Sequence, residues 1–423
     1  MTAFLRKIGI IVKDKNLRSK FIFVVVALII FRAFAAIPIP GVDTLKLEQF
    51  LSNNQFFGLL DVFSGGGLSS LSIVMLGVGP YITGSIIMQL LTMMSPKLKA
   101  MYHEEGEAGR KKFSQYSRML TVPLAILQAV GFILLLKNQG VLDAMNSFQL
   151  GLNVLIVTAG SVLLMWLGEL ITEFGIGNGV SLIIFSGIVA RIPSAMSEIV
   201  LNFNASQIPL ILAFAVCTLA VIGGVVFITE AERPVPVTYA KRVRGNKVYG
   251  GVSTYLPLRI NQAGVIPIIF ALSILIFPQM IAQFLATSGN AIISGGATWV
   301  IGALSNQLVY GVLYFLFVFV FTYFYTAVTF EPDSIATNLQ KNGAFIPGVR
   351  PGVPTSEYLG NIITRITLVG ALFLGVIAVL PLILRAVTGF AALTIGGTAL
   401  LIVVSVVIDL IKKVEAQLTM REY

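Results

Sequence analysis

The chain has 423 residues, of which 56% are hydrophobic and 11% are charged, and its formal net charge is +10. Soluble globular proteins carry about 25% charged residues, so a water-exposed surface cannot be built from so few charges on a chain this long. The composition therefore excludes a soluble protein and indicates one whose main solvent is the lipid bilayer. With one cysteine, Cys217, and one histidine, His103, a disulfide framework is excluded and we expect no metal or other cofactor.

Ten apolar runs are long enough to cross a hydrocarbon core of about 30 Å. They show no two-residue alternation, and only helices and closed barrels satisfy the backbone in lipid, so they predict transmembrane helices. The first run follows a basic N-terminus without a small-residue cleavage site, which favours a retained helix over a signal peptide. The predicted spans are residues 20–38, 73–93, 117–136, 152–172, 180–200, 208–229, 262–284, 307–328, 364–384 and 391–411.

Lys and Arg are unevenly distributed between the two sides that ten spans define. Of the 29 such residues, 24 lie on the side that holds both termini and four on the other. Because cytoplasmic loops carry the excess of Lys and Arg, we expect both termini to be cytoplasmic. The remaining cation, Arg32, lies inside the first span, where we expect a partnered or snorkelling side chain near the outer end.

Three further features of the chain suggest its organisation. Residues 56–72 are too short to span, and Gly65, Gly66 and Gly67 disfavour a continuous helix. They predict a re-entrant piece beside an internal aqueous vestibule, or alternatively an interfacial surface loop. Two long basic loops, about 230–261 and 330–363, predict a docking surface for a cytoplasmic partner, or else serve only as an orientation signal. The spans also divide evenly at about residue 205, which suggests an inverted repeat of halves 1–205 and 206–423.

Polar chemistry inside the spans is sparse. No Ser/His/Asp set can form away from His103, which argues against an intramembrane enzyme, and most span centres lack the ionisable groups that an ion-coupled transporter uses. What remains is uncharged, and such groups either join helices by hydrogen bonds or line a seam that must open. These residues are Thr83, Ser85, Gln89, Gln128 and Ser273.

Six motifs at consistent spacing resemble the SecY family, the channel subunits of the bacterial Sec translocon, over nearly the whole chain. The two longest are residues 164–179 (LMWLGELITEFGIGNG) and 79–91 (GPYITGSIIMQLL). The others are Phe31-Arg32 through Ile37–Gly41, Tyr239–Arg242 (YAKR), Asn261–Pro267 (NQAGVIP) and Gly343–Gly352 (GAFIPGVRPG).

The resemblance implies an all-α membrane protein with ten transmembrane helices. They would form two pseudo-symmetric, inverted five-helix halves around an hourglass pore with a re-entrant plug. A ring of flexible aliphatic side chains would seal the pore, and a lateral gate would lie between spans two and three and spans seven and eight. The implied ring is Val78, Ile82, Val180, Ile184, Ile269 and Ile402. The implied plug is Phe63, Ser64, Gly65, Gly66, Gly67, Leu68 and Ser69, and the implied gate is Ser85, Gln89, Gln128 and Ser273.

The resemblance also implies partners and a location. The long loops would dock the SecA ATPase and the ribosome through Lys241, Arg242, Arg244, Lys247 and Arg350. SecE and SecG would complete a heterotrimer in the bacterial plasma membrane, and signal-bearing precursors would be the cargo. Two positions depart from the family pattern: Asn246 stands beside Lys247 where a basic pair is common, and Tyr255 stands where His is common.

The implied function is a passive, gated pore without enzymatic activity. It would pass unfolded secretory polypeptides and release hydrophobic segments sideways into membrane lipid, where their transfer is favourable. The alternative is a secondary transporter of a small solute.

Overall fold

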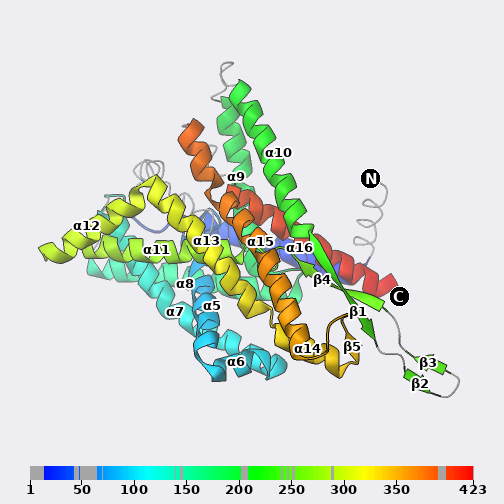
Figure 1. The fold of residues 1–423 in the computed structure, drawn as a ribbon. Coiled ribbons are helices and arrows are strands. Elements are labelled where there is room, and N and C mark those ends of the chain that lie inside the picture. The colour runs from blue at the N-terminus through cyan, green and yellow to red at the C-terminus, as the bar shows by residue number, and fades with distance from the viewer. Residues whose placement is uncertain are drawn as a thin grey trace.

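The protein is seen in a computed structural model that is mostly helical (Figure 1). The structure describes residues 14–41, 47, 64–68, 70–138, 140–142, 146–201, 208–239, 242–244, 247–249, 253–286, 290–388 and 397–422.

The helices of the first half pack on one another. Helix α2 lies against α8 and α9, α5 against α7 and α8, and α8 lies between α7 and α9. We call these the N-terminal group. Its members are α2 (Lys15–Ala35), α5 (Gly79–Met94), the short α6 (Pro96–His103), α7 (Gly106–Asn138), α8 (Ser147–Phe174) and α9 (Gly179–Leu201).

The helices of the second half form another set, the C-terminal group. Helix α13 packs between α11 and α15, α16 contacts α10 and α15, and α14 lies on α15. Its members are α10 (Ile208–Glu230), α11 (Ile266–Ala286), α12 (Ala291–Ser305), α13 (Gln307–Thr329), α14 (Pro332–Lys341), α15 (Val353–Thr388) and α16 (Gly397–Glu422).

The two groups meet along two seams. On one, α11 contacts both α5 and α7, and on the other, α16 contacts α9. A residue on α5, α9, α11 or α16 can therefore face the opposite group, and all six residues of the implied ring lie on or at the end of these four helices.

Each predicted span overlaps a helix, with differences at the ends. The second span begins as helix at Gly79, because Gly77 has φ +57° and Pro80 stands in the first helical turn. Helices α7 and α15 extend beyond the predicted spans, since apolar runs mark only the lipid-compatible part of a helix. Among the described residues, four helices, α7, α8, α13 and α15, contain segments long and apolar enough to cross a membrane. The count of ten spans stays a prediction.

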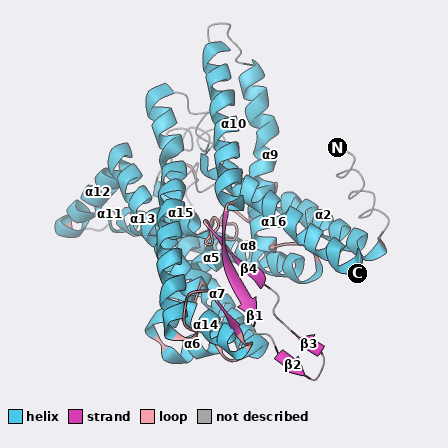
Figure 2. Ribbon diagram, turned by 45° about the vertical axis from the view of Figure 1, so that its right-hand side comes forward, coloured by secondary structure: helices cyan, strands magenta, loops and turns pink. Residues whose placement is uncertain are grey.

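Strands occur in the loops, so the expectation of an all-α chain is wrong there. Strand β1 (Glu232–Tyr239) pairs antiparallel with β4 (Ser253–Arg259) and with β5 (Ala344–Phe345), which gives the order β4-β1-β5. Val235 and Val237 of β1 are buried between exposed neighbours, the alternation of a half-buried strand. Strands β2 (Arg242–Arg244) and β3 (Lys247–Tyr249) form a separate hairpin that projects from the helices (Figure 2).

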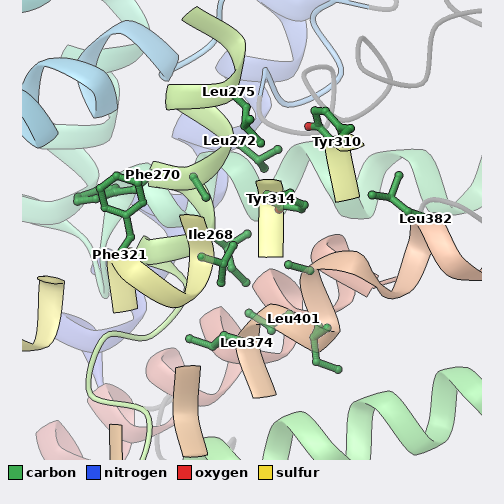
Figure 3. Close-up of a cluster of buried hydrophobic side chains, with 14 of the residues drawn as sticks. Ile268, Phe270, Leu272, Leu275, Tyr310, Tyr314, Phe321, Leu374, Leu382 and Leu401 are labelled. Atoms are coloured by element: carbon green, nitrogen blue, oxygen red, sulfur yellow. The ribbon is translucent and has the colours of Figure 1, made fainter. Parts of the chain in front are cut away.

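Aromatic side chains hold the C-terminal group together. The Phe270 ring meets those of Phe321 and Tyr325 edge-on, at centroid distances of 6.0 and 5.9 Å. A cluster of buried hydrophobic side chains, which we call the C-terminal cluster, fills this group. Tyr314 lies at its centre and is 0% exposed (Figure 3). Edge-to-face aromatic pairs contribute about 0.5–1.5 kcal/mol beyond their buried area. We therefore expect these contacts to hold α11 and α13 together. The labelled members are Ile268, Phe270, Leu272, Leu275, Tyr310, Tyr314, Phe321, Leu374, Leu382 and Leu401.

Candidate functional site

Six aliphatic residues that the sequence assigned to a ring lie in one hydrophobic cluster, which we call the central cluster. Val78 precedes α5 and Ile82 lies in its first turn, while Val180 and Ile184 are on α9. Ile269 on α11 and Ile402 on α16 come from the C-terminal group, so both groups contribute. Val78, Ile184 and Ile402 are 0%, 2% and 1% exposed, whereas Ile82, Val180 and Ile269 are partly buried.

The connection between α8 and α9 determines where Val180 and Ile184 lie. A Cβ added to Gly179 would stand 1.9 Å from the carbonyl oxygen of Gly168, so only glycine permits this close approach. The Thr172 hydroxyl donates to the Gly168 carbonyl and accepts from the Gly179 amide, both at 2.8 Å. The motif at residues 164–179 is thus a tight turn that presents the first turns of α9 to the cluster.

A cavity of about 460 Å³ opens beside the central cluster, and we call it the vestibule. Ile82, Val180, Ile184 and Ile269 line it where it meets the cluster. Its other lining includes polar and charged side chains from α5, α7 and α8 and from the loop before α9. These are Tyr81, Ser85, Gln89, Ser114, Arg118, Glu169, Thr172, Glu173 and Asn178.

An ion pair crosses the polar part of the vestibule. Arg118 Nε on α7 lies 2.5 Å from Glu169 Oε1 on α8. Glu173, one turn further along α8, makes no ion pair within the described part of the chain. The vestibule is therefore lined by polar and charged side chains on one part and by aliphatic side chains of the central cluster on another.

The described part of the implied plug packs against the central cluster. Ser64, Gly65, Gly67 and Leu68 are all buried in turns, while Phe63 and Ser69 lie outside the described residues. Arg32 Nη1 of α2 donates to the Gly65 carbonyl at 2.8 Å, so Arg32 is partnered, as expected for a cation inside a span. The segment is further tied down by Ser70, whose hydroxyl donates to the Ala35 carbonyl at 2.8 Å.

A second glycine, Gly187 of α9, faces the plug segment. A Cβ on Gly187 would stand 2.0 Å from the Gly65 Cα, and Gly65 itself has φ +72°. The plug segment thus lies directly on α9, against the helix that carries Val180 and Ile184. Sequence reasoning missed Gly187 and the Arg32–Gly65 bond. Arg32 was marked only as the one cation within a span, and nothing in the sequence marks Gly187.

The four implied gate residues are half-buried and lie on the helices of the α5/α7–α11 seam. Ser85 and Gln89 of α5 line the vestibule, while Gln128 on α7 and Ser273 on α11 do not. The Gln89 Oε1 atom is buried without a hydrogen-bond partner. Gln128 and Ser273 form no side-chain hydrogen bond with any described residue. The seam is therefore not held by polar contacts between these four residues in the described chain.

The implied docking residues lie outside the helical groups. Arg242 and Arg244 belong to β2 and Lys247 to β3, so they share the projecting hairpin, whereas Lys241 lies outside the described residues. Arg350 lies in the turn between β5 and α15, and its carbonyl accepts a 2.8 Å hydrogen bond from the Thr355 hydroxyl. Because β1 pairs with both β4 and β5, one sheet joins the two long loops.

A family model described as SecY matches residues 72–411, which is most of the chain. The chain belongs to the SecY family. It is 44% identical to the protein translocase subunit SecY of Mycobacterium tuberculosis, with 96% of each chain covered. It is 42% identical to the subunit of the same name from Streptomyces galbus, with 100% and 99% covered.

Solved structures agree with this membership at the level of the fold. A structure titled as that of a protein conducting channel has a TM-score of 0.66 at 18% identity, covering 96% of this chain and 94% of the other. Sec61 in a canine ribosome–channel complex gives 0.64 at 18% identity, with the same coverage. The expectation of a protein-conducting channel subunit, and not an enzyme, is confirmed by the named SecY relatives. The small-solute transporter receives no support.

Proposed function

We propose that the chain is the pore-forming subunit of a passive, gated channel for unfolded secretory polypeptides. The observation that carries the proposal is the convergence of six Val and Ile side chains from both helical groups in one cluster, four of which line the vestibule. Aliphatic side chains adapt to a polypeptide of any sequence, and an apolar constriction dewets when it is empty. The ring therefore seals the membrane at rest and yields to a moving chain.

The plug and the gate extend this mechanism. The segment around Gly65 blocks the channel at rest and leaves when a chain enters, since it is held by a few hydrogen bonds and close glycine packing. Separation of α11 from α5 and α7 opens a path from the vestibule to lipid. A hydrophobic segment then moves into the bilayer, where its transfer is favourable.

Energy and specificity come from partners. The β2–β3 hairpin and the Arg350 turn form the face to which SecA and the ribosome bind, and basic side chains there suit a polyanion such as ribosomal RNA. SecE and SecG complete the complex. The chain lies in the bacterial plasma membrane with both termini in the cytoplasm, so the basic loops face SecA and the ribosome.

Reconstitution tests the proposal directly. The chain is incorporated into vesicles with SecE, and SecA, ATP and an unfolded precursor are added outside. Precursor that becomes protected from protease only with ATP is the expected result. Absence of protection in vesicles with folded, correctly oriented protein, tested with both SecA and ribosome-bound precursors, would contradict it.

The Arg350 turn gives a separate test of docking. Arg350→Glu reverses the charge at the binding face, so we expect loss of SecA-driven export with normal membrane insertion of the variant. Lys112→Glu, an exposed site near the start of α7 and outside both long loops, is the matched control and should leave export close to normal. Normal export by the Arg350 variant would remove this residue from the docking face.

A further inference from the structure

Helix α12 was not expected from the sequence, because it lies between two predicted spans and belongs to neither. It follows α11 and precedes α13, and it lies alongside α11 in both views (Figures 1 and 2). Its 15 residues make it about 22 Å long at 1.5 Å per residue, too short to cross a hydrocarbon core of about 30 Å. If α11 and α13 both span, as the proposed function requires, α12 begins and ends on the outer side of the membrane.

The exposed face of α12 is apolar. Ile292 is 85% exposed, Trp299 75% and Ile293 42%. The neighbouring ends of its flanking helices are also apolar and exposed, at Leu285 of α11 and Leu308 of α13. The sequence contains no charged residue from Ile260 to Phe330. The apolar surface of α12 therefore continues that of the two flanking helices without a charged boundary.

Most polar side chains in and beside α12 bond to its own backbone. The Asn290 side chain accepts from the Ile292 amide at 3.1 Å and caps the start, and Asn306 both ends α12 and caps α13. The Thr298 hydroxyl donates to the Ser294 and Gly295 carbonyls at 3.0 and 2.9 Å. Because the Asn290 cap and the Ser294 and Thr298 hydroxyls bond within the helix, few groups of α12 need water, which favours its placement in lipid.

We propose that α12 is immersed in the outer leaflet of the bilayer, with Trp299 at the level of the lipid headgroups. Tryptophan favours this level because its ring is apolar and its indole N–H needs a polar partner. The inference goes beyond the proposed function but rests on its assumption that α11 and α13 span. Because α11 carries Ile269 and Ser273, a lipid-held α12 anchors the outer end of the helix that faces the ring and the gate.

Fluorescence quenching tests the position of Trp299. The chain has two tryptophans, so Trp166→Phe leaves Trp299 alone in the full-length protein, purified with its partner subunits. Two controls use a background without either tryptophan. Leu316→Trp places the probe at a half-exposed site in α13, and Tyr255→Trp places it on β4, outside the helical groups. Each protein is reconstituted in phosphatidylcholine vesicles with and without bromine on the acyl chains, and aqueous acrylamide is added separately.

We expect brominated lipid to quench Trp299 clearly, although less than the deeper Leu316→Trp, and acrylamide to quench it less than Tyr255→Trp. Strong quenching by acrylamide, or protection from both quenchers, would overturn the inference, because α12 would then face water or another protein. If brominated lipid also fails to quench Leu316→Trp, the spanning arrangement of α13 fails, and the proposed function is contradicted together with this inference.

Cysteine labelling provides a second measurement that leaves both tryptophans in place. In a Cys217→Ala background, Ile292→Cys puts a single thiol at the most exposed position of α12. A membrane-impermeant maleimide should label it slowly in vesicles and quickly after detergent is added. Equally fast labelling in intact, outward-facing vesicles would contradict burial in lipid.

Discussion

The six-residue ring inside the central cluster and the aromatic centre of the C-terminal cluster are both hydrophobic, yet they are built from different side chains. The six implied ring residues of the central cluster are all Val or Ile, and they come from both helical groups. The C-terminal cluster is built around Phe270, Tyr310, Tyr314 and Phe321 and comes almost entirely from one group. We therefore expect the ring to separate when the two groups move apart, and the C-terminal cluster to stay together.

The difference is physical as well as compositional. Flat aromatic rings in edge-to-face pairs have defined partners, and their displacement loses a specific geometry along with buried area. Aliphatic side chains without fixed partners lose mainly buried area, which a passing polypeptide can replace. A ring that must open and reclose is therefore expected to be aliphatic, whereas a cluster that stays together can be built around aromatic rings, as in the C-terminal group.

The largest effect is expected when the aliphatic ring is removed. Ile82→Gly with Ile184→Gly deletes one ring side chain from α5 and one from α9, so water can fill the constriction. A barrier lowered by about 1.4 kcal/mol already raises a rate tenfold, and we expect at least that increase in the resting ion conductance of reconstituted vesicles. Val189→Gly with Ile192→Gly has a similar backbone cost at two exposed sites of α9 and should not leak. Unchanged conductance in a correctly inserted double variant would count against the ring.

The C-terminal cluster should show the opposite phenotype. Phe321→Ala truncates a buried ring in the C-terminal cluster, and such truncations cost about 3–5 kcal/mol of stability. We expect a lower unfolding temperature in detergent, with little increase in the conductance of the folded protein. Leu316→Ala, at a half-exposed site on the same helix, is the control. A large leak without loss of stability would erase the distinction between the two clusters.

The plug should respond to the α9 surface that it covers. Gly187→Val adds a side chain where even a Cβ would meet the Gly65 Cα, so the segment must move away. Overpacking of this kind costs about 1–3 kcal/mol, which here falls on the closed state. We expect a moderate resting leak and easier export of a precursor with a weakened signal sequence. Val189→Ile adds bulk at a more exposed site of α9 and should behave as the unmodified chain.

The smallest effect concerns an ion pair between the two helical groups. Lys99 Nζ of α6 lies 3.1 Å from Glu331 Oε1, just before α14, and the two side chains are 59% and 25% exposed. Exposed pairs of this kind contribute about 0.2–1 kcal/mol. Lys99→Ala should therefore ease gate opening slightly, seen as a modest gain in export of the weak-signal precursor. A double-mutant cycle with Glu331→Ala measures the coupling free energy between the two side chains. A coupling of zero would show that this ion pair does not hold the two helical groups together.

Apolar run length predicted the helices well, because lipid leaves the backbone few alternatives to a helix. Apolar run length failed for elements whose structure depends on contact with water or on tertiary packing. Helix α12 was missed because its apolar run is too short to span and contains Gly295 and Gly296, which argue against a helix in isolation. The sheet formed by β1, β4 and β5 was missed because β1 pairs with β5 of the other long loop, between residues at least 105 positions apart in the chain (Tyr239 and Ala344, 344 − 239 = 105), and local sequence patterns do not reveal such a pairing.

The site was predicted in part. The family resemblance supplied six ring residues that the structure brings into one cluster, although apolar composition alone could not have chosen them among so many Val and Ile. The contact of Gly187 with Gly65 and the bond from Arg32 to Gly65 depend on how α2, α9 and the plug segment pack in space. No spacing rule connects residues that far apart in the chain.

The central claim is that a translocating polypeptide passes through the ring, and cross-linking during transport tests it most directly. A precursor with one cysteine is arrested midway, and the channel carries Cys217→Ala with either Ile402→Cys in the ring or Leu374→Cys in the C-terminal cluster. Both sites are buried at rest, with exposures of 1% and 0%. We expect an ATP-dependent disulfide to the precursor at position 402 and none at 374. A disulfide at 374, or none at 402 although the precursor is arrested in the membrane, would contradict the account.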